Sequence, residues 1–173
     1  MPTPAATGRL RGPEMTLPLL LSVPHGGLGV PPEVSGICLL TAPEVEKDGD
    51  EGAGEIYALG EHVAGFVAAD VARAIVDVNR AEDDFRKDGV VKTHTCWDVP
   101  VYREPLPAAR VETLLAGYYR PFHRQLSLHA AAGSAVLAVD CHTMAAVGPP
   151  VGPDEGQPRP RICLSDGAVS YTH

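Results

Sequence analysis

Apolar runs that end abruptly in polar clusters are the clearest pattern along this chain. The runs at 19–23, 73–76 and 135–139 are short and largely apolar, which is typical of strands buried on both faces of a parallel sheet. Each run is followed by His, Asp, Asn or Arg. The carboxyl ends of parallel strands gather at one edge of a sheet, where ligands bind. The pattern therefore predicts three strands whose carboxyl ends contribute side chains to one site.

Apolar residues at helical spacing predict two helices. Ile56, Leu59, Val63 and Phe66 follow an acidic, glycine-rich turn at 48–52 and share one helical face. A second helical face is traced between 111 and 126, with an interruption expected at Pro121 because proline opposes a regular helix. The segment from Ala81 to Pro107 has no clear period, which predicts a long excursion over the sheet.

The alternation of strands and helices predicts an α/β fold with three layers, αβα, around a mixed, largely parallel sheet. The chain has 173 residues, 45% of them hydrophobic, which suits one core and therefore one domain, predicted over residues 17–173. Residues 1–16 are rich in Pro, Ala, Thr and Gly, and we expect a disordered tail there.

Charge and cysteine usage narrow the function. The net charge of −8 argues against a nucleic-acid surface, which needs clustered Lys and Arg, and favours a small soluble substrate. No apolar stretch is long enough to span a membrane. The four cysteines form no Cys-x-x-Cys pair, so neither a zinc ribbon nor a disulfide scaffold is indicated, and a cytoplasmic location is expected.

Two histidines just beyond predicted strands suggest a metal site. His25 follows the first run and His142 follows the third. A catalytic zinc site usually has three protein ligands drawn from imidazole and carboxylate groups, and Asp50 in the acidic turn would complete the set. A single histidine is more often a structural residue than a ligand, so the site depends on these residues meeting in space.

Other polar residues have both a functional and a structural interpretation. Asp140 lies two residues before His142 and, on extended backbone, would project to the same side, either to orient that histidine or to carry a proton. Its alternative is to cap a nearby turn. His123, just past Pro121, would act as a polarising group or proton shuttle, or simply pack in the core.

Asn79 and Arg80 suggest recognition of an acidic substrate. A guanidinium grips a carboxylate with two parallel hydrogen bonds, and a neighbouring amide adds a third contact. Arg103 would join them. The alternative for Arg80 is an ordinary surface ion pair with Asp83 or Asp84.

Five segments in order resemble the N-formylglutamate amidohydrolase (N-formylglutamate deformylase) family. They are Ser22-Val23-Pro24-His25-Gly26-Gly27, Asp48-Gly49-Asp50, Val76-Asp77-Val78-Asn79-Arg80, Tyr119-Arg120-Pro121-Phe122-His123 and Asp140-Cys141-His142-Thr143-Met144. The resemblance runs from about residue 19 to 167.

The resemblance implies a zinc-carboxypeptidase-like fold and hydrolysis of a formyl amide on an acidic amino acid, as in histidine breakdown. It implies that one zinc ion is held by His25, Asp50 and His142, and that the substrate carboxylates are bound by Arg80 with Asn79. Asp48, Glu51 and Glu55 are close alternatives for the acidic ligand.

One departure from the family is that its members continue past the segment at 162–167. The portion that this chain lacks carries further strands and a glutamate that resembles a catalytic base. We therefore expect a fragment or a shortened relative, in which Asp140 is the remaining candidate for proton transfer. An open sheet edge would offer a route to a homo-oligomer.

Two other functions stay open. The same fold and metal would suit a deacylase or carboxypeptidase with another acylated amino acid or a peptide as substrate. Alternatively, the chain is a truncated, non-catalytic homologue that binds a metal or ligand without chemistry.

Overall fold

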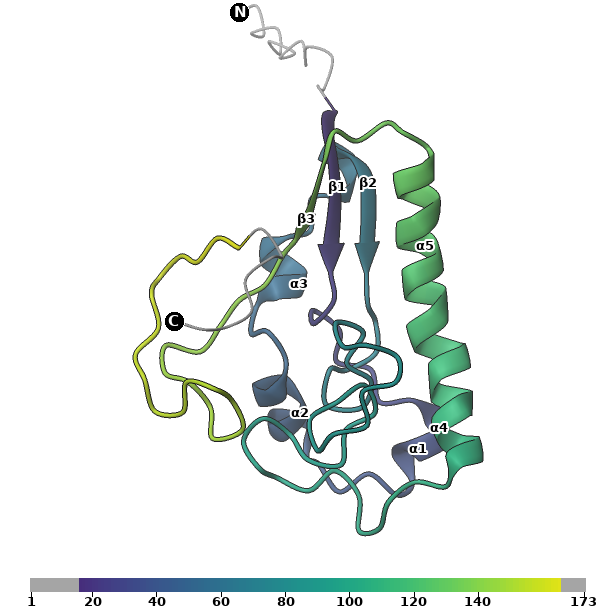
Figure 1. Ribbon diagram of the computed structural model, residues 1–173, viewed down its shortest axis with the longest axis vertical. Coiled ribbons are helices and arrows are strands. Elements are labelled where there is room, and N and C mark those ends of the chain that lie inside the picture. The colour runs from purple at the N-terminus through teal and green to yellow at the C-terminus, as the bar shows by residue number, and fades with distance from the viewer. Residues whose placement is uncertain (1–15, 166–173) are drawn as a thin grey trace, which may run out of the picture.

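A small parallel sheet lies at the centre of the fold. The computed structural model describes residues 16–165. Within them, β1 (Leu17–Val23) lies between β2 (Val63–Ala68) and β3 (Leu137–Asp140) and pairs in parallel with both (Figure 1). The chain is thus a mixed α/β protein, and the strands predicted at 19–23 and 135–139 are confirmed as direct neighbours.

Helical segments contact both faces of this sheet. The helix α5 (Arg120–Ala131) packs along β2 and β1, where Phe122 joins Leu20 and Val67 in the larger core cluster. On the other face, Ala53 of the short helix α3 (Ala53–Ile56) packs with Leu21 and other buried residues of a second cluster. Figure 1 shows α5 and α3 on opposite sides of the strands.

The interruption expected at Pro121 takes the form of a π-helical turn. The helix α4 (Ala108–Leu114) continues into the π-helical segment η2 (Leu115–Tyr119) and then into α5, with Pro121 in the first turn of α5. Proline has no N–H to donate to the preceding turn, and the π-helical turn lies directly before it.

The helix predicted over Ile56 to Phe66 is wrong. The helix α3 ends at Ile56, the 3₁₀ turn η1 (Gly60–His62) follows, and Val63 begins β2. Along β2 the burial alternates between successive residues, as expected for a strand, and from Gly65 to Ala68 each residue pairs in register with β1. The four apolar residues at helical spacing therefore do not share one helix, since Ile56 ends α3 and Val63 and Phe66 belong to β2.

The strand predicted at 73–76 is also wrong. This segment forms turns, in which the N–H groups of Ile75 and Val76 donate to the carbonyl oxygen of Ala72. All of Ala72, Ala74, Ile75 and Val76 are fully buried. An apolar run reports burial but does not distinguish a strand from a buried turn.

The remaining elements are short. They are α1 (Pro32–Ser35) and α2 (Ala42–Asp48), and between β2 and α4 the chain has no named helix or strand, as predicted for 81–107. None of the helices in residues 16–165 is long and apolar enough to cross a bilayer. The β3 strand is exposed along its length. The expected tail at 1–16 lies outside the described residues except for Thr16.

Two glycines after His25 allow the chain to pass very close to neighbouring backbone. A Cβ atom on Gly27 would lie 2.4 Å from the carbonyl oxygens of Ala69 and Asp70, and one on Gly26 would lie 3.1 Å from the backbone of Gly54. The loop that follows β1 is therefore pressed against both the end of β2 and the start of α3, and this contact fixes the position of His25.

Substituting Gly27 tests this close approach. We expect Gly27→Ala to lower the free energy of unfolding by about 3 kcal/mol, because the added methyl group must displace backbone atoms rather than a flexible side chain. Urea unfolding curves measure the change. The control is Gly36→Ala, whose Cβ would meet nothing within 4 Å and should change stability by less than about 0.5 kcal/mol. Equal effects of the two substitutions would contradict the packing described.

Candidate metal centre

The parallel pairing of β1 and β3 brings two histidines together from distant parts of the chain. His25 follows the end of β1, and His142 follows the end of β3. The pairing continues past the strands, since Cys141 N–H donates to the carbonyl oxygen of Ser22 over 2.8 Å. The two imidazole rings lie with their centroids 4.9 Å apart.

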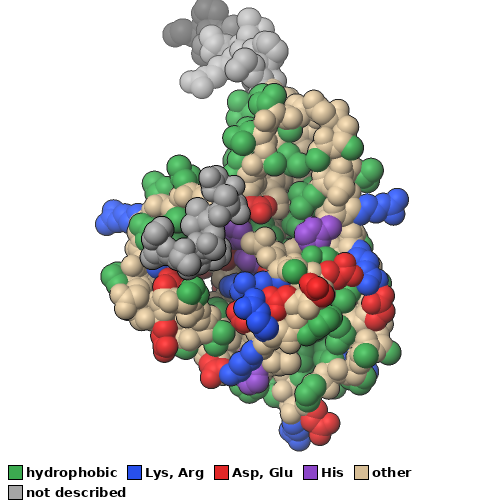
Figure 2. All heavy atoms as spheres, viewed as in Figure 1, with side chains coloured by type: hydrophobic (Ala, Val, Ile, Leu, Met, Phe, Trp, Pro, Cys, Tyr) green, Lys and Arg blue, Asp and Glu red, His purple; other side chains and the backbone are tan. Residues whose placement is uncertain are grey.

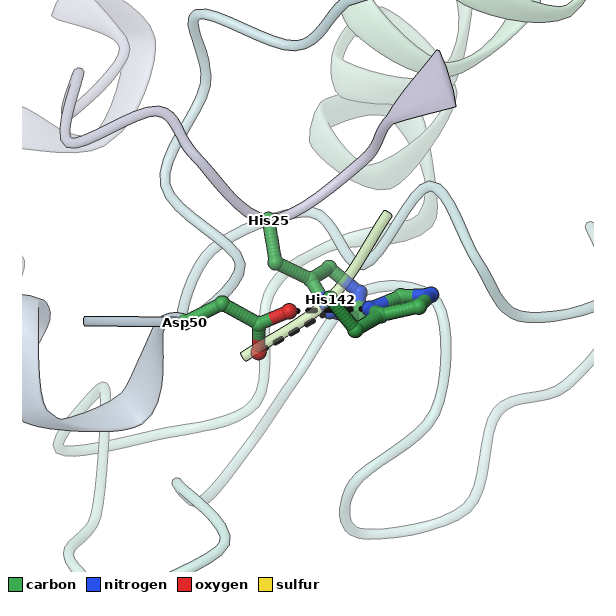
Figure 3. A group of neighbouring side chains, drawn as sticks. All are labelled: His25, Asp50 and His142. Atoms are coloured by element: carbon green, nitrogen blue, oxygen red, sulfur yellow. Dashed lines mark hydrogen bonds and ion pairs between the residues drawn. The ribbon is translucent and has the colours of Figure 1, made fainter. Parts of the chain in front are cut away.

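The acidic turn supplies a carboxylate to the same place. The backbone N–H of Asp50 donates to the carbonyl oxygen of His25 (3.2 Å), and the Asp50 carbonyl accepts from Ala53 N–H at the start of α3. The turn is therefore hydrogen-bonded to the loop that carries His25. The side chain of Asp50 points toward both imidazoles (Figure 3).

The three side chains converge on one point. Asp50 Oδ2 lies 2.8 Å from His142 Nδ1, and Asp50 Oδ1 lies 3.5 Å from His25 Nδ1. One potential ligand atom from each residue lies within 4.8 Å of the others. Figure 2 shows histidine, acidic and basic side chains gathered in the middle of one face of the molecule. The predicted trio is thus brought together.

Asp77 fixes the orientation of His25. Its Oδ1 lies 2.8 Å from His25 Nε2 and also accepts from the backbone N–H of Asn79. A proton on Nε2 satisfies this contact and leaves the lone pair of Nδ1 facing Asp50. Two acceptors that face each other need a positive charge between them. A proton on Nδ1, in line with the raised pKa of His25, or a bound cation would supply that charge, and a carboxylate behind a ligating imidazole is a common feature of metal sites.

His142 is held by contacts to its ring and its backbone. Its Nε2 lies 3.3 Å from the side-chain amide of Asn79, and its carbonyl oxygen accepts from the Tyr57 hydroxyl. The hydroxyl of the next residue, Thr143, donates to the carbonyl oxygen of Glu51 in the acidic turn. These contacts join the segment after β3 to the turn that carries Asp50.

The electrostatics of the cluster favour ionised carboxylates beside a positive group. Burial opposes ionisation of Asp50, but hydrogen bonds to His142 and His25 outweigh it and lower the pKa to about 2. Burial also opposes charge on His25, yet hydrogen bonds to Asp50 and Asp77 raise the pKa of its imidazole above 6.5. For Asp77 the hydrogen bond to His25 and nearby cations outweigh burial, so its pKa is far below 3.8.

Behind the cluster lies a buried charge network that sequence reasoning missed. Lys92 and Asp48 are fully buried, and Lys92 Nζ lies 3.1 Å from Asp48 Oδ2. Arg73 donates from Nε to Asp77 Oδ2 and from Nη1 to the carbonyl oxygen of Asp48. The carboxylates of Asp48 and Asp77 are thus paired with Lys92, Arg73 and Arg80, while the carboxylate of Asp50 faces the two imidazoles. A positive charge beside Asp50, carried by a protonated imidazole or by a metal ion, is therefore favoured.

The donor set fits a divalent metal ion. Two imidazole nitrogens and one carboxylate oxygen are ligands that zinc accepts, and three protein ligands leave a position for water or substrate. The alternatives for the acidic ligand, Asp48, Glu51 and Glu55, do not belong to the converging group in the described residues. Asp48 instead accepts from Cys96 N–H over 2.6 Å and pairs with Lys92.

The predicted substrate-binding residues are only partly assembled. Asn79 contacts His142, and its neighbour Arg80 is about one-third exposed, with Nη2 3.1 Å from Asp88 Oδ2 and Nε 3.6 Å from Asp77 Oδ2. The alternative ion pair of Arg80 with Asp83 or Asp84 is therefore replaced by one with Asp88. Arg103 is exposed in the long loop.

Asp140 and His123 take places that differ from those expected. The ring nitrogens of His142 face Asp50 and Asn79, so Asp140 does not orient that imidazole. Asp140 is exposed on β3, where it is paired in register with Ser22. His123 Nε2 lies 2.9 Å from the carbonyl oxygen of Val78, next to Asn79. His123 therefore contacts the segment behind the cluster.

Comparison with known proteins supports a family assignment. The profile of the family "N-formylglutamate amidohydrolase" matches residues 17–171. An N-formylglutamate deformylase of Pseudomonas aeruginosa is 30% identical over 119 residues, which are 64% of this chain and 44% of that protein.

Solved structures agree at the level of the fold. The crystal structure of N-formylglutamate amidohydrolase from Ralstonia eutropha JMP134 has a TM-score of 0.64 at 23% identity, over 75% of this chain and 55% of that one. A gene product of Agrobacterium tumefaciens has a TM-score of 0.64 at 22% identity, over 77% and 54% of the two chains. The chain thus spans about half the length of these relatives. Since the family profile covers nearly the whole chain, the protein belongs to the N-formylglutamate amidohydrolase family.

Proposed function

We propose that the protein binds one divalent metal ion, zinc by its donor set, through His25, Asp50 and His142. The observation that carries this proposal is the convergence of three potential ligand atoms from three separate segments on one point. The buried contact between Asp77 and His25 supports the proposal, because it selects the ring nitrogen that faces the centre.

The proposed reaction is hydrolysis of the amide of N-formyl-L-glutamate, or of a similar N-acylated acidic amino acid, to the free acid and amino acid. Membership of an amidohydrolase family supports this reaction class, and the relatives' names supply the substrate. A bound zinc ion would supply Lewis acidity toward the acyl oxygen and would lower the pKa of water to about 7.

The chain's own residues have distinct proposed roles. Asn79 is exposed and contacts His142, and the partly exposed guanidinium of its neighbour Arg80 is positively charged and suited to a substrate carboxylate. Arg103 is a further candidate for this contact. Arg80 already faces Asp77 and Asp88. A substrate carboxylate would therefore bind Arg80 as a third acidic partner and would displace neither of these two.

Proton transfer to the leaving amine needs a further group. Asp140, exposed at the carboxyl end of β3, and His123, beside Asn79, are the candidates. Asp50 is a proposed ligand, and Asp77 is tied to His25 and to three cations, so neither is free for this task.

That shortage of free carboxylates favours a second candidate function. A metal-binding homologue without catalytic activity would retain the cluster and lack an efficient proton-transfer group. A deacylase or carboxypeptidase with a different acyl-amino-acid or peptide substrate would retain both the metal and the carboxylate contacts.

Metal analysis tests the proposed site. We expect the purified protein to bind about one zinc ion, and we expect His25→Ala and His142→Ala each to lose it, because each removes one of three ligands. Elemental analysis after dialysis measures the stoichiometry. His62→Ala is the matched control, since His62 lies in η1 outside the cluster, and should retain zinc. Retention of zinc in both ligand variants would remove the site.

A substrate panel separates the candidate functions. We expect the zinc-loaded protein to release formate from N-formylglutamate, and Arg80→Met to raise KM by roughly 10-fold or more because it removes a charge-assisted contact of about 1.5–3 kcal/mol. Turnover of N-acetyl or N-succinyl acids with inert N-formylglutamate would point to another deacylase. Bound zinc with no hydrolysis of any of these compounds would leave a non-catalytic binder.

The cluster also predicts how stability depends on pH without metal. Asp50, with its pKa lowered from 3.8 to about 2, contributes about 2 kcal/mol above pH 3.8 that is lost as the pH falls toward 2. His25, with a raised pKa, contributes stability below pH 6.5 that is lost as the pH rises through its folded value. We therefore expect maximal stability between these limits.

Chemical unfolding of the metal-free protein at several pH values measures this profile. His25→Ala should lose the decline on the alkaline side, while His62→Ala should keep it. A stability of the unaltered protein that rises steadily from pH 5 to pH 9 would contradict the described contacts.

A further inference from the structure

Lys92 is a fully buried cation outside the ligand set. None of its side chain is exposed, and its Nζ faces two carboxylates, with Asp48 Oδ2 at 3.1 Å and Asp77 Oδ2 at 3.8 Å. Burying an ammonium group away from water costs several kcal/mol unless it is paired. We therefore look for a role of Lys92 that a hydrophobic side chain of similar length could not fill.

The two carboxylates that Lys92 faces belong to two different ligand-bearing segments. Asp48 ends α2 and lies two residues before the proposed ligand Asp50. Asp77 lies in the loop after β2, and its other oxygen, Oδ1, contacts the proposed ligand His25. Lys92 thus stands between the acidic turn and the group that orients the imidazole.

The division of Asp77 between its two oxygens gives Lys92 an influence on His25. Oδ2 faces three cations, Arg73 Nε at 3.2 Å, Arg80 Nε at 3.6 Å and Lys92 Nζ at 3.8 Å, while Oδ1 faces His25 and the backbone of Asn79. Cations on one side hold the carboxylate plane so that the other oxygen stays aimed at the imidazole. Of the three cations, Lys92 is fully buried and pairs with the side chain of Asp48, whereas Arg73 donates to the backbone carbonyl of Asp48 and Arg80 also pairs with Asp88.

We propose that Lys92 is a positioning residue of the metal centre, which holds Asp48 and Asp77 together and thereby sets the places of Asp50 and His25. This inference rests on the proposed metal site. It goes beyond that site in assigning to Lys92 a share of the metal affinity, although Lys92 contacts none of the three ligands.

The test must separate positioning from stability. Lys92→Met alone leaves two buried carboxylates without their shared cation and would unfold part of the protein. The double variant Lys92→Met with Asp48→Asn removes one charge of each sign. The new asparagine keeps the oxygen that accepts from Cys96 N–H. Asp77 keeps Arg73 in this variant, so we expect a cooperatively folded protein.

Zinc affinity, measured by competition with a chelating indicator, is the readout. We expect the double variant to bind zinc about 10-fold more weakly than the unaltered protein, which is the lower end of the loss seen when a direct partner of a metal ligand is removed, because Asp77 itself is retained. The matched control is Glu112→Gln with Arg120→Met, which removes the exposed ion pairs of Arg120 with Glu112 and Glu82, contacts none of the three ligands and should leave the affinity unchanged. Equal affinity of the double variant and the unaltered protein would overturn the proposal.

Asp77→Asn identifies the route of the effect. If Lys92 acts through Asp77, the loss of affinity caused by Asp77→Asn will be smaller in the double variant than in the unaltered protein, and purely additive losses would overturn the proposal. Should the double variant fail to fold, the ¹⁵N signal of the Lys92 ammonium in the unaltered protein decides: it should shift on zinc addition, and an unchanged signal would overturn the proposal. Failure of the unaltered protein to bind zinc would instead reject the proposed function.

Discussion

The carboxylate of Asp77 is the interaction on which the rest of the centre depends. It is buried almost completely, and it is ionised because His25, Arg73 and Lys92 surround it. Removing such a group from water is costly, and only partners on all sides offset the cost. Those partners come from distant parts of the chain. The network therefore holds the loops together at the carboxyl edge of the sheet, where little regular structure would otherwise fix them.

The sheet and the buried charge network position different residues of the site. Parallel pairing of β1 and β3 sets the separation of His25 and His142, since each follows the end of its strand. The network and the close backbone approach at Gly27 then fix the loops that carry Asp50 and Asn79. A rigid scaffold with irregular loops at its edge is a common arrangement for a binding site. Such a scaffold brings together residues that lie far apart in the sequence.

The sequence was sufficient to predict that His25, Asp50 and His142 cluster, and insufficient for the charge network behind them. His25 and His142 could be predicted because strand-end residues on parallel neighbours must meet, and the acidic turn marked Asp50. The segment at 73–76 was mistaken for a strand because an apolar run records burial and not conformation. Lys92 and Asp48 carried no usable signal, since a charged residue in a sequence is normally exposed, and only the three-dimensional pairing explains their burial. Asp77 did carry a signal of burial, because a valine lies on each side of it in the sequence.

The central claim is that two imidazoles and one carboxylate, held by this buried network, share a single cation. X-ray absorption spectroscopy at the zinc edge of the loaded protein tests it most directly, because multiple scattering reports the number of bound imidazole rings. We expect two imidazoles together with oxygen ligands at about 2.0–2.2 Å. A spectrum with no imidazole contribution, or one dominated by sulfur at about 2.3 Å, would contradict it.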